Sequence, residues 1–170
     1  MKSRPFWLEV LGLLAILAAI SNFAAAPASA ATVVALGASN TYGKGVARNQ
    51  AFPAQLEAIL RAKGLNCRVI NAGINGDTTE GMLRRMDRAV PNGTSAVILQ
   101  PGGNDARKGS PDRTAEIQSR LRGRGIAVIL LPNNVSKGLP HQPDGQHLTP
   151  EGYRMIAEYL ASQVAGVIGR

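Results

Sequence analysis

The sequence predicts a three-layer α/β fold, in which a parallel sheet of four or five strands lies between helices on its two faces. Two observations predict it. Short aliphatic runs alternate along the chain with longer amphipathic segments. The aliphatic runs also lack the apolar–polar alternation of a half-exposed strand, so we expect strands that are buried on both faces. The predicted strands are residues 32–37, 67–71, 95–100 and 126–131.

The segments between the strands predict helices. In the first, apolar residues recur at helical spacing: Phe52, Leu56, Ile59 and Leu60. Gly64 ends that helix. The second helix covers residues 79–90 and has one apolar face, made of Met82, Leu83 and Met86.

The last two helices are predicted from their first residues. Ser110 is the expected N-cap of the third, followed by Pro111 and Asp112, and that helix ends near Gly123 or Gly125. The final helix starts with a Thr149-Pro150-Glu151 cap. We expect its inner stripe to be Met155, Ile156, Tyr159, Leu160, Val164 and Val167.

The first thirty residues predict a signal peptide rather than part of the fold. Lys2 and Arg4 precede an apolar run at residues 10–20, and Ala28-Ser29-Ala30 has the small-residue pattern of a cleavage site. The run is shorter than the about 20 residues of a membrane span. We therefore expect Sec-type export, cleavage near Ala30/Ala31, and a mature domain of residues 31–170. That domain would be periplasmic or secreted and would keep no stable membrane anchor.

Composition and charge restrict the class of protein and its partners. A 45% hydrophobic and 18% charged chain of 170 residues is typical of one globular domain. The single cysteine, Cys67, excludes an intramolecular disulfide framework and a cysteine-based zinc site. The formal charge of +8 suits anionic partners. The basic cluster Arg120, Arg122 and Arg124 has no aromatic platforms beside it, so we expect no nucleic-acid binding.

Candidate catalytic residues lie in the loops that follow the predicted strands. Ligands of such sheets bind outside the carboxyl ends of the strands. Ser39 follows the first strand, Asn104 lies after the third, and Asp144 and His147 precede the last helix. A histidine base can activate a serine nucleophile, and a carboxylate can hold the imidazole tautomer. These residue types therefore point to acyl transfer.

Four sequence blocks give this chain a resemblance to a known family. They are GAS at 37–39, NGDTT at 75–79, GGND at 102–105 and DGQH at 144–147. In this order they resemble the SGNH hydrolases, also called GDSL esterases, and especially the small bacterial periplasmic thioesterase, lysophospholipase and arylesterase branch. The resemblance covers essentially the whole mature chain and implies the flavodoxin-like architecture of that family.

The resemblance implies a role for each block. Ser39 would be the nucleophile, His147 the base and then the acid, and Asp144 its orienting carboxylate. The oxyanion hole would consist of the backbone N–H groups of Ser39 and Gly76 and the side-chain amide of Asn104. The family forms an acyl-enzyme and needs no metal or organic cofactor.

The chain departs from the family pattern in two places. The family's Asp before the nucleophile is Ala38 here. In addition, only residues 133–143 separate the fourth strand from Asp144, where family members place a further helix and strand. We therefore expect an irregular loop, a fourth strand at the sheet edge, and an open pocket walled mainly by residues 42–48 and 101–109. Such a pocket should favour short acyl groups.

Other interpretations of the same residues stay open. Ser39 could cap a turn, and Gly73 is expected to be a plain turn glycine. His141, Asp144 and His147 form an H-x-x-D-x-x-H pattern, but no fourth metal ligand is evident, so we expect no metal.

The function predicted is an exported serine hydrolase that cleaves small-molecule acyl esters or thioesters. Its substrates would be short-chain acyl or aryl esters, acyl thioesters or lysophospholipids. The alternatives are a carbohydrate deacetylase of the same family and a non-catalytic ligand-binding member of the fold, which only Ala38 favours. The sequence does not indicate an oligomeric state.

Overall fold

Four parallel strands form the sheet in residues 29–169, the part of the chain that the computed structural model describes. β1 (Ala31–Gly37) lies between β2 (Cys67–Gly73) and β3 (Thr94–Gln100), and β4 (Ala127–Leu130) pairs with the far side of β3. The predicted parallel sheet is confirmed. Within residues 29–169 there is no fifth strand, so β4 lies at the sheet edge as predicted.

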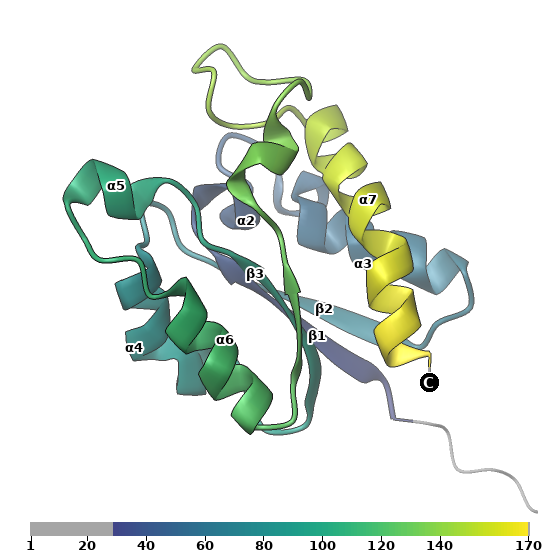
Figure 1. The fold of residues 1–170 in the computed structure, drawn as a ribbon. Coiled ribbons are helices and arrows are strands. Elements are labelled where there is room, and N and C mark those ends of the chain that lie inside the picture. The colour runs from purple at the N-terminus through teal and green to yellow at the C-terminus, as the bar shows by residue number, and fades with distance from the viewer. Residues whose placement is uncertain (1–28, 170) are drawn as a thin grey trace, which may run out of the picture.

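Helices cover both faces of this sheet and make the three predicted layers (Figure 1). α3 (Phe52–Ala62) and α7 (Pro150–Ile168) pack on one face. α4 (Thr79–Ala89) and α6 (Thr114–Gly123) pack on the other. The loops of the candidate site gather at the carboxyl ends of the strands, near the start of α7.

The side chains of β1 divide between two hydrophobic cores. Val33 and Ala35 enter the core beneath α3 and α7, and Val34 and Leu36 enter the core beneath α4 and α6. All four are fully buried. This explains the unbroken aliphatic run in the sequence, because neither face of a central parallel strand meets water.

The helix starts were predicted with mixed success. α7 begins as expected, since Thr149 accepts a hydrogen bond from the N–H of Gly152 at 3.2 Å. The expected Ser110 cap of α6 is wrong, because that helix begins at Thr114. The Asp112 carboxylate accepts the N–H of Thr114 at 2.8 Å, while the Ser110 hydroxyl donates to Glu80 at 3.4 Å.

The predicted inner stripe of α7 is also partly wrong. Met155 and Tyr159 are 42% and 51% exposed. The buried face of α7 is rotated from the predicted one and includes two alanines: its residues are Tyr153, Ile156, Ala157, Leu160, Ala161 and Val164. Alanines let the helix lie close to α3 and the sheet, and two larger side chains on the next face are left in solvent.

Two one-turn helices were not predicted, α2 (Ser39–Tyr42) and α5 (Asn104–Lys108). Each is shorter than one hydrophobic repeat, so no periodicity can reveal it. Residues 133–143 form the predicted irregular segment. It contains a 3-10 turn (Asn133–Ser136), and His141 then forms an isolated antiparallel bridge with Leu148.

Candidate active site

Ser39 lies on a tightly packed turn at the end of β1. It is the first residue of α2, which lies against the ends of β1 and β2. A Cβ on Gly37 would be 2.2 Å from the Thr41 hydroxyl, and one on Gly73 would be 2.1 Å from the backbone nitrogen of Tyr42. The expectation of a plain turn glycine at position 73 is therefore wrong: its missing side chain lets α2 approach β2.

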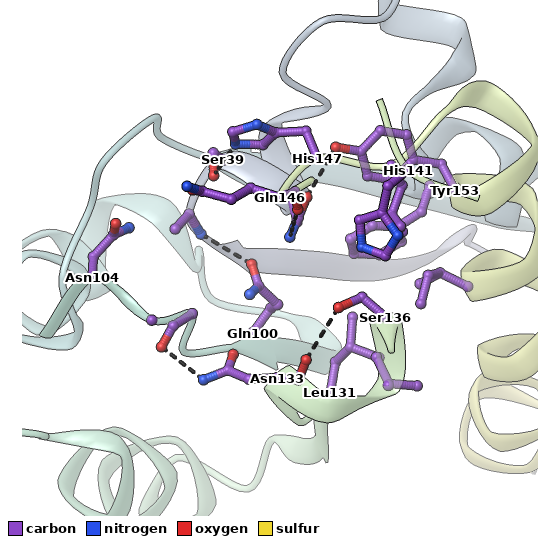
Figure 2. Close-up of a pocket in the computed structure, with 18 of the residues that line it drawn as sticks. Ser39, Gln100, Asn104, Leu131, Asn133, Ser136, His141, Gln146, His147 and Tyr153 are labelled. Carbon is purple, nitrogen blue, oxygen red and sulfur yellow. Dashed lines mark hydrogen bonds between the residues drawn. The ribbon is translucent and has the colours of Figure 1, made fainter. Parts of the chain in front are cut away.

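His147 and Asp144 form a hydrogen-bonded chain with Ser39. The Nε2 atom of His147 is 2.9 Å from the Ser39 hydroxyl, and its Nδ1 atom is 2.5 Å from an Asp144 carboxylate oxygen. His147 is buried. Because a carboxylate accepts hydrogen bonds, Nδ1 carries the proton in neutral His147, and Nε2 is free to accept the Ser39 proton. Figure 2 shows the His147 ring beside Ser39.

The Asp144 carboxylate is held in its ionised form by its neighbours. The hydrogen bond from His147 lowers the pKa of Asp144 well below its usual range, and the backbone N–H groups of His147 and Gln146 lower it further. Both N–H groups donate to the second carboxylate oxygen at 2.9 Å. The orientation of this carboxylate is thus determined by backbone as well as by the imidazole.

The side chain of Asn104 is buried and its amide orientation is fixed by two neighbours. Its Nδ2 donates to the backbone oxygen of Asp77 at 2.7 Å, and its Oδ1 accepts from the Arg107 guanidinium at 2.6 Å. A carbonyl only accepts and a guanidinium only donates, so the amide has one possible orientation. One N–H of Nδ2 then remains for another acceptor. No sequence pattern pointed to this role of Arg107.

Gly76 lies opposite Asn104, in a turn with a φ of 73° that favours glycine. Its carbonyl accepts a hydrogen bond from Lys108 at 2.6 Å. Gly76, Asn104, Ser39 and His147 all line one cavity of about 270 Å³. The structure therefore brings all five sequence-predicted residues to one end of the sheet, four of them around this cavity and Asp144 behind His147.

Two carboxylates brace the loops around that cavity. Asp77 forms a largely buried ion pair with Arg85 at 2.8 Å, and Arg85 also donates to the backbone oxygen of Gly37 at 3.2 Å. Asp105 accepts the N–H of Thr79 at 2.9 Å. These contacts tie the loops after β2 and β3 to the turn that carries Ser39.

Gln100 supports the turn where the family pattern has an aspartate. Ala38 is buried, and its N–H donates to the side-chain oxygen of Gln100 at 3.3 Å. The same oxygen accepts from the Thr41 hydroxyl at 3.1 Å. Gln100, at the end of β3, thus holds both sides of Ser39. The sequence offered no signal for it, because 62 residues separate it from Ala38.

Ser39 also lines a second cavity, of about 230 Å³ (Figure 2). Of the expected wall residues 42–48, Lys44 lines the first cavity and none lines the second. Its walls come from residues 100–107 and from the segment between Leu131 and Leu148. The Arg48 guanidinium stacks over the Tyr42 ring at 4.3 Å.

Residues 29–169 show neither a metal-ligand cluster nor a membrane-spanning helix. Over that range, no three of the His, Cys, Asp and Glu side chains gather as metal ligands would, and this includes His141, Asp144 and His147. Within the same range, no helix combines the length and hydropathy that crossing a membrane requires. Residues 1–28 of the expected signal peptide lie outside the described residues.

Similarity to known proteins extends over most of the chain. The model of the GDSL-like Lipase/Acylhydrolase family matches residues 35–159. Esterase TesA of Pseudomonas aeruginosa is 32% identical over 110 residues, which cover 61% of this chain and 55% of TesA. That match spans about half of the relative's length.

Solved structures share the fold. AlinE4, described as an SGNH-hydrolase family esterase, is 28% identical with a TM-score of 0.54, over 81% of this chain and 74% of AlinE4. TesA has a TM-score of 0.65 at 24% identity, over 80% of this chain and 99% of TesA. EstA, a psychrotrophic esterase from Pseudoalteromonas, has a TM-score of 0.66 at 16% identity, over 82% of this chain and 99% of EstA. With its four blocks in order on this fold, the chain belongs to the GDSL-like lipase/acylhydrolase family of SGNH hydrolases.

Proposed function

We propose that this protein hydrolyses carboxylic esters or thioesters through an acyl-enzyme on Ser39. The observation that carries the proposal is the chain of hydrogen bonds from Ser39 through His147 to Asp144, with two cavities that Ser39 and His147 both line. An activated serine needs a base within hydrogen-bonding distance and a group that orients the base, and both are present.

Catalysis would proceed in two steps, formation of the acyl-enzyme and its hydrolysis. His147 Nε2 takes the Ser39 proton while the serine oxygen attacks the substrate carbonyl carbon. His147 then returns the proton to the leaving oxygen or sulfur, and the bond between carbonyl carbon and leaving group breaks. In the second half His147 takes a proton from water, the hydroxide attacks the acyl-enzyme, and Ser39 leaves with the proton that His147 gives back.

Three donors would stabilise the negative charge that develops on the carbonyl oxygen. Two are the backbone N–H groups of Ser39 and Gly76, and the third is the remaining N–H of the Asn104 amide. Arg107 supports this arrangement because it donates to Asn104 Oδ1 at 2.6 Å and so fixes which end of the amide is the donor. Donors that are fixed before the reaction need no reorganisation when the charge appears.

The relatives' names support esters as the substrate class, since TesA, AlinE4 and EstA are all described as esterases. Short-chain acyl or aryl esters and acyl thioesters fit the two small cavities beside Ser39. Rates on p-nitrophenyl esters should therefore fall from acetate to palmitate.

The proposal also includes export of the enzyme from the cytoplasm. The basic start, the apolar run and the Ala28-Ser29-Ala30 pattern support cleavage after Ala30 and a periplasmic or secreted enzyme. Intact-mass measurement of exported protein should give a chain that begins at Ala31. Full-length protein recovered only from membranes would contradict export but not hydrolysis.

Fluorophosphonate labelling tests the catalytic proposal directly. The purified protein should take up one label on Ser39, and Ser39→Ala should take up none. Ser162→Ala, on the exposed face of α7, is the matched control and should label like wild type. A folded wild-type protein that never labels would overturn the proposal and favour a non-catalytic binder.

A further inference from the structure

The hydroxyl of Tyr153 is a polar group inside a hydrophobic core. Tyr153 lies near the start of α7, is fully buried, and belongs to the same core as Phe52, Leu148 and Ile156. A phenylalanine would fill nearly the same space, and a buried hydroxyl costs free energy unless it is hydrogen-bonded. Packing alone therefore does not account for the oxygen atom.

The Tyr153 hydroxyl donates to a residue that directly follows Ser39. Its partner is Oδ1 of Asn40, at 3.1 Å, and 113 residues separate the two in the sequence. Burial raises the pKa of Tyr153 to about 12, although a backbone hydrogen bond from Leu148 lowers it, and the Asp144 charge adds to the rise. The hydroxyl therefore keeps its proton near neutral pH and remains a donor to Asn40.

Asn40 extends this contact to the loop that carries His147. Its Nδ2 donates to the backbone oxygen of Gln146 in a long hydrogen bond of 3.5 Å. Because that carbonyl only accepts, Nδ2 faces Gln146 and Oδ1 faces the Tyr153 hydroxyl. The two side chains thus contact the residue before His147 and, through the backbone of Leu148, the residue after it. Figure 2 shows the Tyr153 hydroxyl directed toward His147.

From this arrangement we infer that Tyr153 and Asn40 are positioning residues, which hold the His147 loop against the turn that carries Ser39. The inference rests on the proposed role of His147 as the base. The reacting atoms of Ser39 and His147 are 2.9 Å apart, and the two positioning residues join the segments directly beside them. A misplacement of about 1 Å can cost roughly 10²-fold in rate, so contacts outside the reacting pair can control kcat.

The Asp144 carboxylate cannot set this distance by itself. Asp144 and His147 are three residues apart in the same loop, so their hydrogen bond moves with the loop as a unit. It orients the imidazole ring but does not connect the loop to β1. Asn40 belongs to the one-turn helix that begins at Ser39, so a contact from Asn40 to the loop fixes the base relative to the nucleophile.

Tyr153→Phe tests the inference because it removes the hydroxyl and keeps the ring. With rates expressed per Ser39 site that fluorophosphonate labels at completion, kcat on p-nitrophenyl acetate should fall about tenfold and KM should change less than about twofold. Tyr159→Phe makes the same chemical change on the exposed face of α7 and should behave like wild type. Wild-type kcat in Tyr153→Phe, or a change confined to KM, would overturn the inference.

The His147→Ala background shows whether the hydroxyl acts through the base. Adding Tyr153→Phe to His147→Ala should change the residual rate less than about twofold, because no base remains to be positioned. A general structural defect, or the loss of a substrate contact, would lower the residual rate by the same factor as in wild type. That result would overturn the inference.

Asn40→Ala tests the same link without a change in the core, since Asn40 is only half-buried. It should lower kcat by a factor similar to that of Tyr153→Phe, and the double variant should be little worse than either single one. Asn40→Asp should not recover the activity, because a carboxylate can accept from Tyr153 but cannot donate to Gln146. Asn134→Ala, at an exposed position, is the control. Losses that multiply in the double variant would contradict a single link.

The same assays separate this inference from the function on which it depends. If wild type cleaves p-nitrophenyl acetate and Ser39 takes the label, but Tyr153→Phe is as fast as wild type, only the positioning inference fails. If no ester is cleaved and Ser39 takes no label in the folded wild-type protein, the proposed function fails as well.

Discussion

Ser39 and His147 are hydrogen-bonded to each other, yet two very different parts of the molecule hold them. Ser39 follows a fully buried strand on a turn where two glycines leave no room for a Cβ. His147 lies in the segment between β4 and α7, which contains a 3-10 turn but no strand. The fold itself positions Ser39, the proposed nucleophile, whereas a few polar contacts position His147, the proposed base.

Gln142 provides several of those contacts in the second region. Its side-chain nitrogen donates to the backbone oxygens of Lys44 and Leu148 at 2.8 and 2.7 Å. Its backbone N–H donates to the oxygen of His147 at 2.7 Å. A loop held this way can lose its geometry while the core stays intact, so changes in the two regions should have different consequences.

Removing either member of the reacting pair should have the largest effect. Ser39→Ala or His147→Ala should lower kcat by about 10³ or more, because triad residues act as a unit. The double variant should be little worse than either single one, and the melting temperatures should change little. Steady-state kinetics on p-nitrophenyl acetate measures this. Wild-type turnover in Ser39→Ala would refute the mechanism.

The oxyanion donor should come next. Asn104→Ala should lower kcat by about 10²–10³, as expected for one preorganised donor. The nucleophile stays in place, so fluorophosphonate should still react with Ser39, more slowly than in wild type. Labelling as fast as wild type together with unchanged kcat would remove Asn104 from the oxyanion hole.

Arg107 should matter less than the amide that it orients. Arg107→Leu frees Asn104 to rotate and should lower kcat about tenfold with a smaller change in KM, and Arg107→Lys should recover part of the loss. Arg84→Leu, which removes an exposed helix ion pair at 3.3 Å, is the control and should behave like wild type. A loss that appears only in KM would assign Arg107 to substrate binding instead.

One pair of substitutions sharpens the contrast between the two regions. Gly73→Ala forces a Cβ against the backbone of α2 and should lower the free energy of unfolding by about 1–3 kcal/mol. Gln142→Ala removes only surface hydrogen bonds near His147 and should lower kcat several-fold with a smaller loss of stability. Urea denaturation and kinetics on both variants measure this. Equal stability losses would refute the contrast.

The smallest expected effect is the contribution of the Asp144 carboxylate to the pH dependence of stability. Its pKa is lowered in the folded state, chiefly by the hydrogen bond from His147. An aspartate with a depressed pKa contributes stability above its unfolded value of about 3.9, and that contribution disappears as pH falls through the folded pKa. Wild type should therefore exceed Asp144→Asn in stability at pH 6, and the difference should shrink at pH 3. A difference that grows on acidification would contradict this sign.

Much of this arrangement was open to prediction because it depends on local pattern. Unbroken aliphatic runs identified the four strands, and the Thr149-Pro150 cap identified the start of α7. The order of polar residues after each strand predicted that Ser39, Gly76, Asn104 and His147 meet at the carboxyl ends of the strands. The side of a helix was harder to predict: Met155 and Tyr159 share the apolar period of α7, and only packing against α3 decided that they face solvent.

The sequence by itself therefore determined the sheet, the order of its elements and which loops meet, because strand burial and helix caps depend on neighbouring residues. Only the tertiary structure decided how the site is held and walled. Gln100 reaches Ala38 across 62 residues, Arg107 reaches Gln146 across 39, and Gln142 reaches Lys44 across 98. No spacing in the chain encodes such contacts. They form because a parallel sheet brings the ends of its strands to one edge, where polar side chains hydrogen-bond with whichever partners lie within reach.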